Sequence, residues 1–299
     1  MSLNNRQLTI LVTGSNGQLG NELQVIAPGF VDTRFLFVSK EALNIADALA
    51  TEKYFSEHPI DYCINCAAYT AVDKAESEPE NAFLINATAI ANLATVCKIN
   101  NTQLIHISTD YVFDGTASEP YKETDQTNPA SVYGRSKLLG EELALQNDPS
   151  TIIIRTSWLY SSFKNNFVKT MLRLMKEKES GPADRHGINV VNDQFGSPTY
   201  AADLALAIMQ IIASNKSKEN PGIYHYTNAG VTNWYEFAVA IKKITNSTCT
   251  VNPITTAAYP TAAKRPAYSV LNTIKMTSTF GLSIPGWKDS LKQCLQLLK

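Results

Sequence analysis

Short apolar runs alternate with amphipathic segments through the first 160 residues of the chain. The runs are rich in β-branched residues and lie at 8–14, 34–39, 60–68, 103–109 and 151–160, and segments with helical spacing fill the gaps between them. Neighbouring parallel strands need a crossover connection, which is usually a helix and nearly always right-handed. The alternation therefore predicts an α/β protein with a Rossmann-type, doubly wound parallel sheet.

After Tyr160 the alternation weakens, and the region near the C-terminus carries several prolines and few long periodic runs. This change predicts a second, smaller α/β lobe. We predict a dinucleotide-binding domain at 1–157, to which segments of about 188–230 return, and a mainly substrate-binding lobe at 158–299. The segment ESGPADRHG at 179–187 has the composition of a turn and is predicted to be an exposed loop.

Three glycines, Gly14, Gly17 and Gly20, lie between the first predicted strand and the first predicted helix. Glycine permits a tight turn and a close approach of a diphosphate to the backbone, and the helix N-terminus adds free N–H groups. Ordinary turns also use glycine, and the spacing is GxxGxxG rather than GxGxxG. The position of the triad after the first strand of a βαβ pattern favours a dinucleotide site.

Two further motifs follow predicted strands. The small residues at 67–68 come after the third strand, and the polar run Ser108–Tyr111 comes after the fourth. Tight loop packing explains the first equally well, and a cap or Asx-turn is an alternative for the second. Because the carboxyl ends of parallel strands share one edge of the sheet, we expect both motifs to lie beside the glycine loop.

The helix predicted at 131–147 contains Tyr133 and Lys137 in the motif YGRSK. Positions i and i+4 share one face of a helix, so the phenol and the ammonium occupy one region. A solvated surface pair is the alternative. A nearby cation would lower the pKa of the phenol, which could then protonate an alkoxide as a hydride arrives at a carbonyl. Thr109 would polarise that carbonyl and Lys137 would hold the cofactor ribose.

Composition excludes several classes of function. The chain of 299 residues is 44% hydrophobic and 18% charged, with a net charge of −1, so nothing indicates nucleic acid or an anionic membrane as a partner. No apolar run reaches the length of a membrane span and no signal peptide is visible, which predicts a cytoplasmic protein. Cys63 and Cys66 fall on opposite faces of a strand, and the four histidines are scattered, so we predict no metal site.

Eight segments together resemble one family along nearly the whole chain. They are GQLG, AAYTAVDKAE, STDYVFDG, YGRSKLLGE, RTSWLY, NNFVKTMLRL, NDQFGSPT and KRPAYSVLN. These segments resemble the extended short-chain dehydrogenase/reductases and, within them, the dTDP-4-dehydrorhamnose reductase family. The resemblance implies reduction of the 4-keto group of dTDP-4-dehydro-L-rhamnose to dTDP-L-rhamnose. The resemblance is compatible with a homodimer but does not require one.

The resemblance also implies roles for individual residues. The catalytic residues would be Thr109, Tyr133 and Lys137. The residues around the cofactor, with Tyr133 and Lys137 among them, would be Gly14, Asn16, Gly17, Gln18, Leu19, Asn44, Ile45, Ala67, Ala68 and Tyr69. Substrate contacts would come from Thr70, Asp110, Tyr111, Trp158, Asn166 and Arg265. For Trp158, plain core packing is the alternative.

The chain departs from the family pattern at three places, one of which is the loop GPADRHG at 181–187, which is longer than in the family and has no assigned role. Some members hold Mg²⁺ through several glutamates; Glu22 matches one, but Ala202 stands where another would be. After the second strand, where the family often has an acidic residue, this chain has Ser39 and Lys40. Both residues suit a 2′-phosphate, so we predict NADPH as the preferred cofactor with NADH also used, and we expect Glu41 to point away.

Two other functions stay open on the sequence alone. One is a nucleotide-sugar epimerase or dehydratase on the same scaffold, although no glutamate follows Asp110 as dehydratases usually require. The other is a non-catalytic regulatory subunit of methionine adenosyltransferase, which shares the fold and the cofactor pocket. The complete set of Thr109, Tyr133 and Lys137 favours an enzyme.

Overall fold

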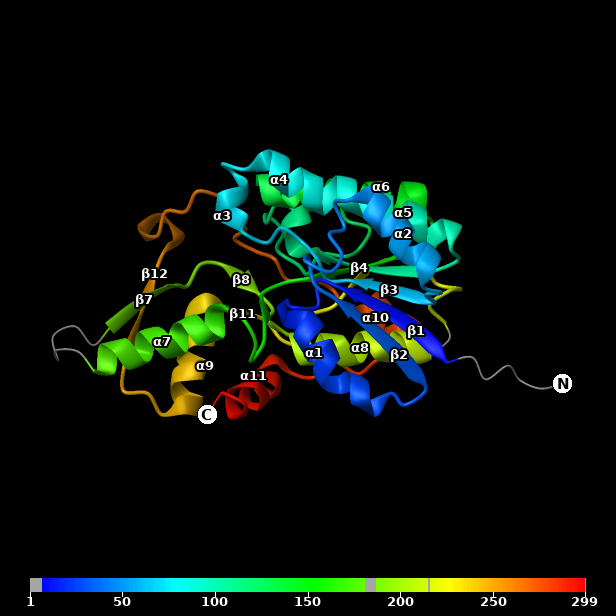
Figure 1. The fold of residues 1–299 in the computed structure, drawn as a ribbon. Coiled ribbons are helices and arrows are strands. Elements are labelled where there is room, and N and C mark those ends of the chain that lie inside the picture. Colours follow the sequence, from blue (N-terminus) through cyan, green and yellow to red (C-terminus); the bar gives the residue numbers. More distant parts are fainter. Residues whose placement is uncertain (1–6, 181–186, 215, 299) are drawn as a thin grey trace.

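The computed structural model describes residues 7–180, 187–214 and 216–298 (Figure 1). Its central sheet has six parallel strands in the order β10-β5-β4-β3-β1-β2. They are β1 (Leu8–Thr13), β2 (Thr33–Val38), β3 (Tyr62–Asn65), β4 (Gln103–Thr109), β5 (Ile152–Thr156) and β10 (Gly222–His225). The predicted doubly wound parallel sheet is confirmed, and its last strand comes from the C-terminal half of the chain.

Strand β1 lies where the order of the strands reverses. From β1 the chain runs outward to β2 at one edge and then returns to β3 on the other side of β1. In such sheets ligands bind outside the carboxyl ends of the strands at the reversal. The loops that follow β1 and β3 are therefore where a bound dinucleotide is expected.

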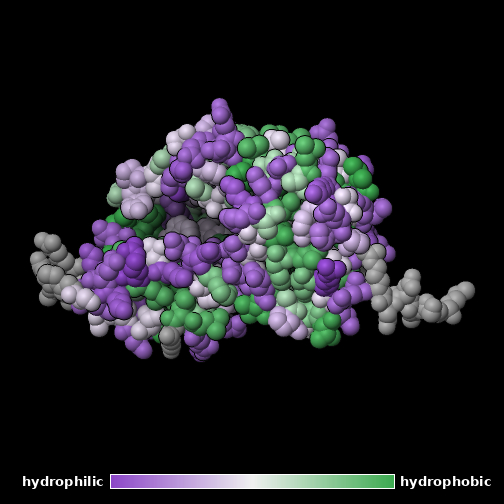
Figure 2. All heavy atoms as spheres, viewed as in Figure 1, coloured by the Kyte–Doolittle hydropathy of each residue, from purple (hydrophilic) through white to green (hydrophobic). Residues whose placement is uncertain are grey.

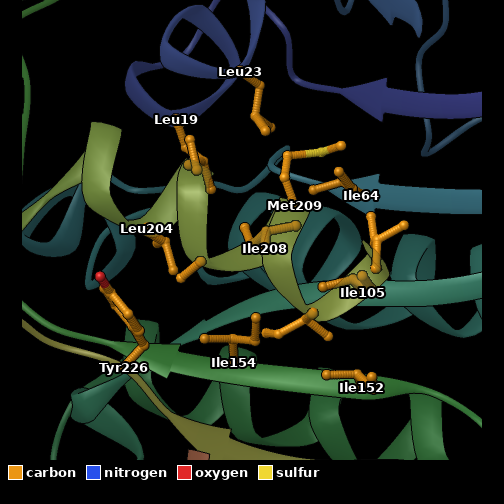
Figure 3. Packing of buried hydrophobic residues seen from close by; sticks show 14 of the residues in the cluster. Leu19, Leu23, Ile64, Ile105, Ile152, Ile154, Leu204, Ile208, Met209 and Tyr226 are labelled. Carbon is orange, nitrogen blue, oxygen red and sulfur yellow. The ribbon is translucent and has the colours of Figure 1, made fainter. Parts of the chain in front are cut away.

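Helices cover both faces of the sheet (Figure 1). α1 (Gln18–Ile26) and α8 (Ala201–Ala213) cover one face, and α2 (Ala48–Glu57), α5 (Ala89–Ile99) and α6 (Val132–Asn147) cover the other. The core under α1 and α8 includes Leu19, Leu23, Ile64, Ile105, Ile154, Leu204 and Ile208 (Figure 3). Cys63 and Cys66 belong to opposite cores, as the strand pattern predicted.

One helical run, 79–99, is long and apolar enough to cross a membrane by length and composition, whereas sequence analysis found no such run. It joins α4 (Pro79–Phe83), a π-helical turn (Leu84–Thr88) and α5. Half of its apolar window is buried within the protein, and Ile90, Leu93 and Ala94 are fully buried against the sheet. We therefore assign this run as a helix of the protein core.

Several helices begin at a polar residue whose side chain caps the first turn. Ser131 Oγ accepts a hydrogen bond from the Gly134 N–H at 3.1 Å, at the start of α6. Asn233 Oδ1 accepts from the Glu236 N–H at 2.8 Å, at the start of α9 (Trp234–Thr245). Such caps satisfy N–H groups that have no partner inside a helix. The helix predicted at 131–147 is thus confirmed with Ser131 as its cap.

The C-terminal half has an apolar core of its own. α7 (Phe167–Glu179), α9 and α11 (Trp287–Gln296) pack around the parallel pair β7 (Gly187–Val191) and β12 (Thr250–Ile254), while α10 (Ile274–Phe280) packs against β10. Two short pairs join β6 (Leu159–Tyr160) to β9 (Thr199–Tyr200) and β8 (Phe195–Gly196) to β11 (Thr232–Asn233). Most of the predicted loop at 179–187, namely 181–186, lies outside the described residues.

Candidate active site

The loop after β1 approaches the end of β3 too closely for a side chain. Gly14 has a φ of +63°, and a Cβ on it would lie 2.6 Å from the amide nitrogen of Ala67. Gly17 then precedes α1, whose N-terminus has no capping side chain, so its N–H groups and positive dipole end remain at this edge of the sheet. Asn16 is exposed in the loop, and Leu19 is buried beneath it. These features fit the diphosphate of a dinucleotide.

Tyr133 and Lys137 lie on the buried face of α6, with 9% and 1% of their surfaces exposed. The alternative of a solvated surface pair is therefore wrong. The Tyr133 hydroxyl is hydrogen-bonded to the side chain of Thr109, where β4 ends. Thr109 Oγ1 in turn donates to Asp110 Oδ1 at 3.0 Å. The structure thus brings the three predicted catalytic residues to the carboxyl edge of the sheet.

The electrostatics of this group differ from the expectation. Burial raises the pKa of Tyr133 to about 12, although the hydrogen bond with Thr109 acts in the opposite direction. Burial lowers the pKa of Lys137 to about 8. Lys137 Nζ donates to the Ile107 carbonyl at 2.7 Å and lies 3.2 Å from His106 Nε2. In this structure, therefore, burial raises the pKa of the Tyr133 phenol by more than the Lys137 amine could lower it.

Two polar residues within apolar strands contact this group and were missed by sequence analysis. Asn65 in β3 and His106 in β4 are fully buried, and Asn65 Nδ2 lies 2.9 Å from His106 Nδ1. Thr13 Oγ1 donates to Asn65 Oδ1 at 2.5 Å. The signal was a polar residue inside each aliphatic run, in DYCINCAA and QLIHIST, because buried polar groups persist where they have partners.

The loop after β3 is tied to α6 by Asn86, another residue that sequence analysis missed. Asn86 Oδ1 accepts from the Tyr69 N–H at 2.9 Å, and Nδ2 donates to the Tyr69 carbonyl and to Ser136 Oγ, both at 3.0 Å. Asn86 lies in the π-helical turn, a feature often found at functional sites. These bonds hold the predicted contacts at 67–70 against the helix that carries Tyr133.

A hollow lies between the short helix α3 (Val72–Ala75) and β8 (Figure 2). Trp158 is half-buried and packs on β8, since a Cβ on Gly196 would lie 2.6 Å from its ring. Its ring stacks on Trp234 with centroids 3.6 Å apart, and its φ is +48°. A left-handed backbone at so large a residue costs about 1–3 kcal/mol, and such strain concentrates at functional sites. The contacts of the ring are those of packing, so a substrate contact at Trp158 stays a prediction.

Tyr111 and Arg265 come together from distant parts of the chain. They line one small cavity, and the Tyr111 ring packs edge-on against Tyr133 with centroids 5.5 Å apart. Arg265 Nη2 donates to Asp73 Oδ2 at 2.5 Å, which links the C-terminal half to α3. Thr70, just before α3, is exposed. Tyr111 thus contacts Tyr133 and also lines a cavity together with Arg265.

Two predicted substrate residues are engaged by the protein itself. Asp110 is buried, and burial raises its pKa to about 6 in spite of hydrogen bonds from Ser269 and Thr109. Asn166 caps α7, and its Nδ2 donates to Gln18 Oε1 at 3.0 Å. In this structure the Asp110 carboxylate accepts a hydrogen bond from Thr109, and the Asn166 amide donates one to Gln18.

The end of β2 departs from one expectation. Lys40 is exposed and Ser39 half-buried, but Glu41 does not point away. Its hydrogen bond with Ser39 is the main cause that holds the pKa of the Glu41 carboxyl below its usual value. Asn44 is exposed and Ile45 is buried just beyond. A carboxylate therefore lies beside the two residues predicted to accommodate a 2′-phosphate.

Glu22, the residue matched to a metal-binding glutamate, is buried in α1. Its carboxylate accepts from Ser161 Oγ at 2.6 Å, and burial raises its pKa. Within the described ranges, no three His, Cys, Asp or Glu side chains are grouped so that they could hold a metal ion.

Comparison with known proteins agrees with this geometry. A family model described as the RmlD substrate binding domain matches residues 8–299. A dTDP-4-dehydrorhamnose reductase from Aggregatibacter actinomycetemcomitans is 40% identical over 291 residues, which span 95% of this chain and 97% of that protein.

Two solved structures superpose on nearly the whole chain. A dTDP-4-dehydrorhamnose reductase from Clostridium acetobutylicum has a TM-score of 0.90 and 41% identity, covering 97% of this chain and 99% of its own. The enzyme of the same name from Bacillus anthracis, in complex with NADP, has a TM-score of 0.90 and 37% identity, with the same coverage. Because these matches extend from the glycine loop to the last helix, the chain belongs to the RmlD substrate binding domain family, which includes dTDP-4-dehydrorhamnose reductases.

Proposed function

We propose that this chain reduces the 4-keto group of dTDP-4-dehydro-L-rhamnose to give dTDP-L-rhamnose, with NADPH as the preferred reductant. The observation that carries the proposal is the position of Tyr133, which is buried beside Thr109 and shares a helix face with Lys137. The uncapped glycine loop at the same edge of the sheet provides the place for the cofactor. Relatives named for this activity match along nearly the whole chain.

The residues of the site divide the chemistry between them. The reduced nicotinamide, when bound, supplies the hydride that reaches the carbonyl carbon. Tyr133 gives its proton to the carbonyl oxygen as negative charge develops there. Thr109, held beside the Tyr133 hydroxyl where β4 ends, hydrogen-bonds the same carbonyl oxygen and polarises it. Lys137 holds the cofactor ribose from the same face of α6.

We assign the sugar nucleotide to the hollow between α3 and β8. Trp158 supplies a flat apolar wall there, and Arg265 brings a cation that suits the diphosphate. Most of this wall comes from the lobe at 158–299, which we propose as the substrate-binding part of the chain. Thr70 and Tyr111 would complete the contacts, with Asp110 and Asn166 behind them.

The test is oxidation of NADPH with a panel of 4-keto nucleotide sugars, run with and without EDTA. We expect the dTDP-4-dehydro-L-rhamnose reaction to be the fastest and to survive EDTA, because Thr109 and Tyr133 handle the oxygen without a Lewis acid. Turnover of a different sugar at a higher kcat/KM would reject the substrate. Loss of activity that only Mg²⁺ restores would reject the metal-free mechanism.

The balance between NADPH and NADH should depend on two neighbouring charges at the end of β2. We expect kcat/KM to be higher with NADPH, Lys40→Ala to lower the NADPH:NADH ratio, and Glu41→Gln to raise it. Each change should be about two- to fivefold, because exposed charges are screened by solvent. Steady-state kinetics with both cofactors measure the ratio. A wild-type protein that uses NADH as well as or better than NADPH would contradict the proposal.

A further inference from the structure

The amide of Asn65 has only one orientation that satisfies its neighbours. Its Oδ1 accepts from the Ala67 N–H at 3.3 Å and from Thr13 Oγ1, and its Nδ2 lies 3.4 Å from the Ala67 carbonyl. A flipped amide would place its NH₂ against a backbone donor and its oxygen against a backbone acceptor. Nδ2 therefore donates to His106 Nδ1 at 2.9 Å.

This orientation decides the tautomer of His106. Because Nδ1 accepts a hydrogen bond, it carries no proton, and a neutral ring must carry its proton on Nε2. Burial holds the pKa of His106 well below its usual value, which keeps the ring neutral. The Nε2–H then faces Lys137 Nζ at 3.2 Å. A ring N–H can donate to an uncharged amine but opposes an ammonium, which has no lone pair.

We propose that His106 is a positioning residue for Lys137, and that its Nε2–H, fixed by Asn65, favours the uncharged form of the amine. The proposal rests on the proposed function in that it gives Lys137 a part in a reaction that consumes one proton per turnover. A protonated Lys137 can then give its proton to the Tyr133 phenolate that the reduction leaves, and it takes a new proton from solvent before the next turnover.

The other groups around the amine do not provide this effect. Glu141 lies one turn further along α6 and acts in the opposite direction, since its charge raises the pKa of Lys137; its carboxylate is also bonded to Arg155 of β5, at 2.6 Å, and to Ser108 of β4. Tyr133, one turn earlier, is an uncharged phenol at neutral pH. The Ile107 carbonyl accepts from Nζ whether the amine is charged or not. Among these groups, His106 is therefore the one whose ring proton favours the uncharged Lys137 amine over the ammonium.

The first measurement needs no substitution. We expect ¹⁵N NMR of the ring nitrogens in the cofactor-free protein to show His106 protonated on Nε2 and bare on Nδ1. The opposite tautomer would overturn the proposal. This result does not depend on whether the chain is a reductase, so it separates a failure of the inference from a failure of the proposed function.

The second measurement compares two buried strand histidines. In His106→Gln the new side chain can turn its oxygen toward Nζ, which should raise the pKa of Lys137 by roughly one unit, the size of one hydrogen bond to a charged group. Since Lys137 acts while protonated, activity is present below its pKa and lost above it. The basic limb of the kcat profile should therefore move to higher pH, and the ¹⁵N titration of Nζ should move with it.

The control is His225→Gln, which removes an equally buried imidazole from β10, where Nδ1 lies 3.1 Å from the Tyr121 carbonyl. It should lower stability to a similar extent without moving the basic limb. An unchanged limb and Nζ titration in His106→Gln, or an equal shift in His225→Gln, would refute the role of His106.

Discussion

Replacing Tyr133 by phenylalanine is expected to lower kcat by about 10²-fold or more, the usual contribution of a general acid. The ring and its packing against Tyr111 would remain, while the proton that the carbonyl oxygen receives would be lost. Cofactor affinity should change little, because the phenylalanine leaves the glycine loop untouched. The measurements are NADPH oxidation at saturating substrate and a separate titration of NADPH binding.

The matched control is Tyr160→Phe. Tyr160 is also buried, even more deeply than Tyr133, but its hydroxyl has no hydrogen-bond partner among the described residues. This variant should keep near-normal turnover and stability, since it removes only an unpaired polar atom from the apolar core of the C-terminal half. A Tyr133→Phe enzyme as active as the Tyr160→Phe enzyme would exclude Tyr133 as the proton donor.

Arg155→Met is expected to lower the free energy of unfolding by about 3–5 kcal/mol. Arg155 donates to Glu141 through Nε at 3.0 Å and through Nη2 at 2.6 Å, and both side chains are nearly inaccessible to solvent. Removing the arginine would leave the Glu141 carboxylate buried, without its ion pair and, among the described residues, with only the Ser108 hydroxyl donating to it. Urea denaturation followed by circular dichroism measures the loss.

Two comparisons make this prediction specific. The double variant Arg155→Met with Glu141→Leu should recover much of the lost stability, because no isolated charge remains. Arg173→Met removes an exposed pair with Glu177 on α7 and should change the midpoint little. A double variant no more stable than Arg155→Met would show that the loss comes from packing rather than from the unpaired carboxylate.

The sequence predicted the elements whose periodicity extends over many residues. The helix predicted at 131–147 is present at Val132–Asn147, and the strand predicted to end at Thr109 does end there, with an aliphatic run unbroken but for His106. The pairs β6–β9 and β8–β11 could not be predicted, because a strand of two residues has no period.

Within the site, the sequence predicted which residues take part better than it predicted which atoms they contact. Tyr133 and Thr109 came together as expected, yet nothing in the order of residues shows that Asn65 would lie opposite His106 on the neighbouring strand. The turn of Glu41 back onto Ser39 and the left-handed backbone of Trp158 are also set by local three-dimensional geometry. Such features depend on neighbours distant in the chain or on torsion angles that residue type does not specify.

The edge strand β10 also affects how the protein can form on the ribosome. Residues 222–225 pair with β5, and α8, at 201–213, covers one face of the sheet, but about 45 residues separate β5 from the start of α8. A nascent chain that has produced β1 to β5 still exposes that apolar face and an open strand edge. Completing the sheet requires contacts distant in sequence, which slows folding and leaves aggregation-prone surface exposed in the interval. The nucleotide-binding half therefore depends on later-synthesised residues, and a shortened gene encoding only that half would give a chain that lacks part of its own core.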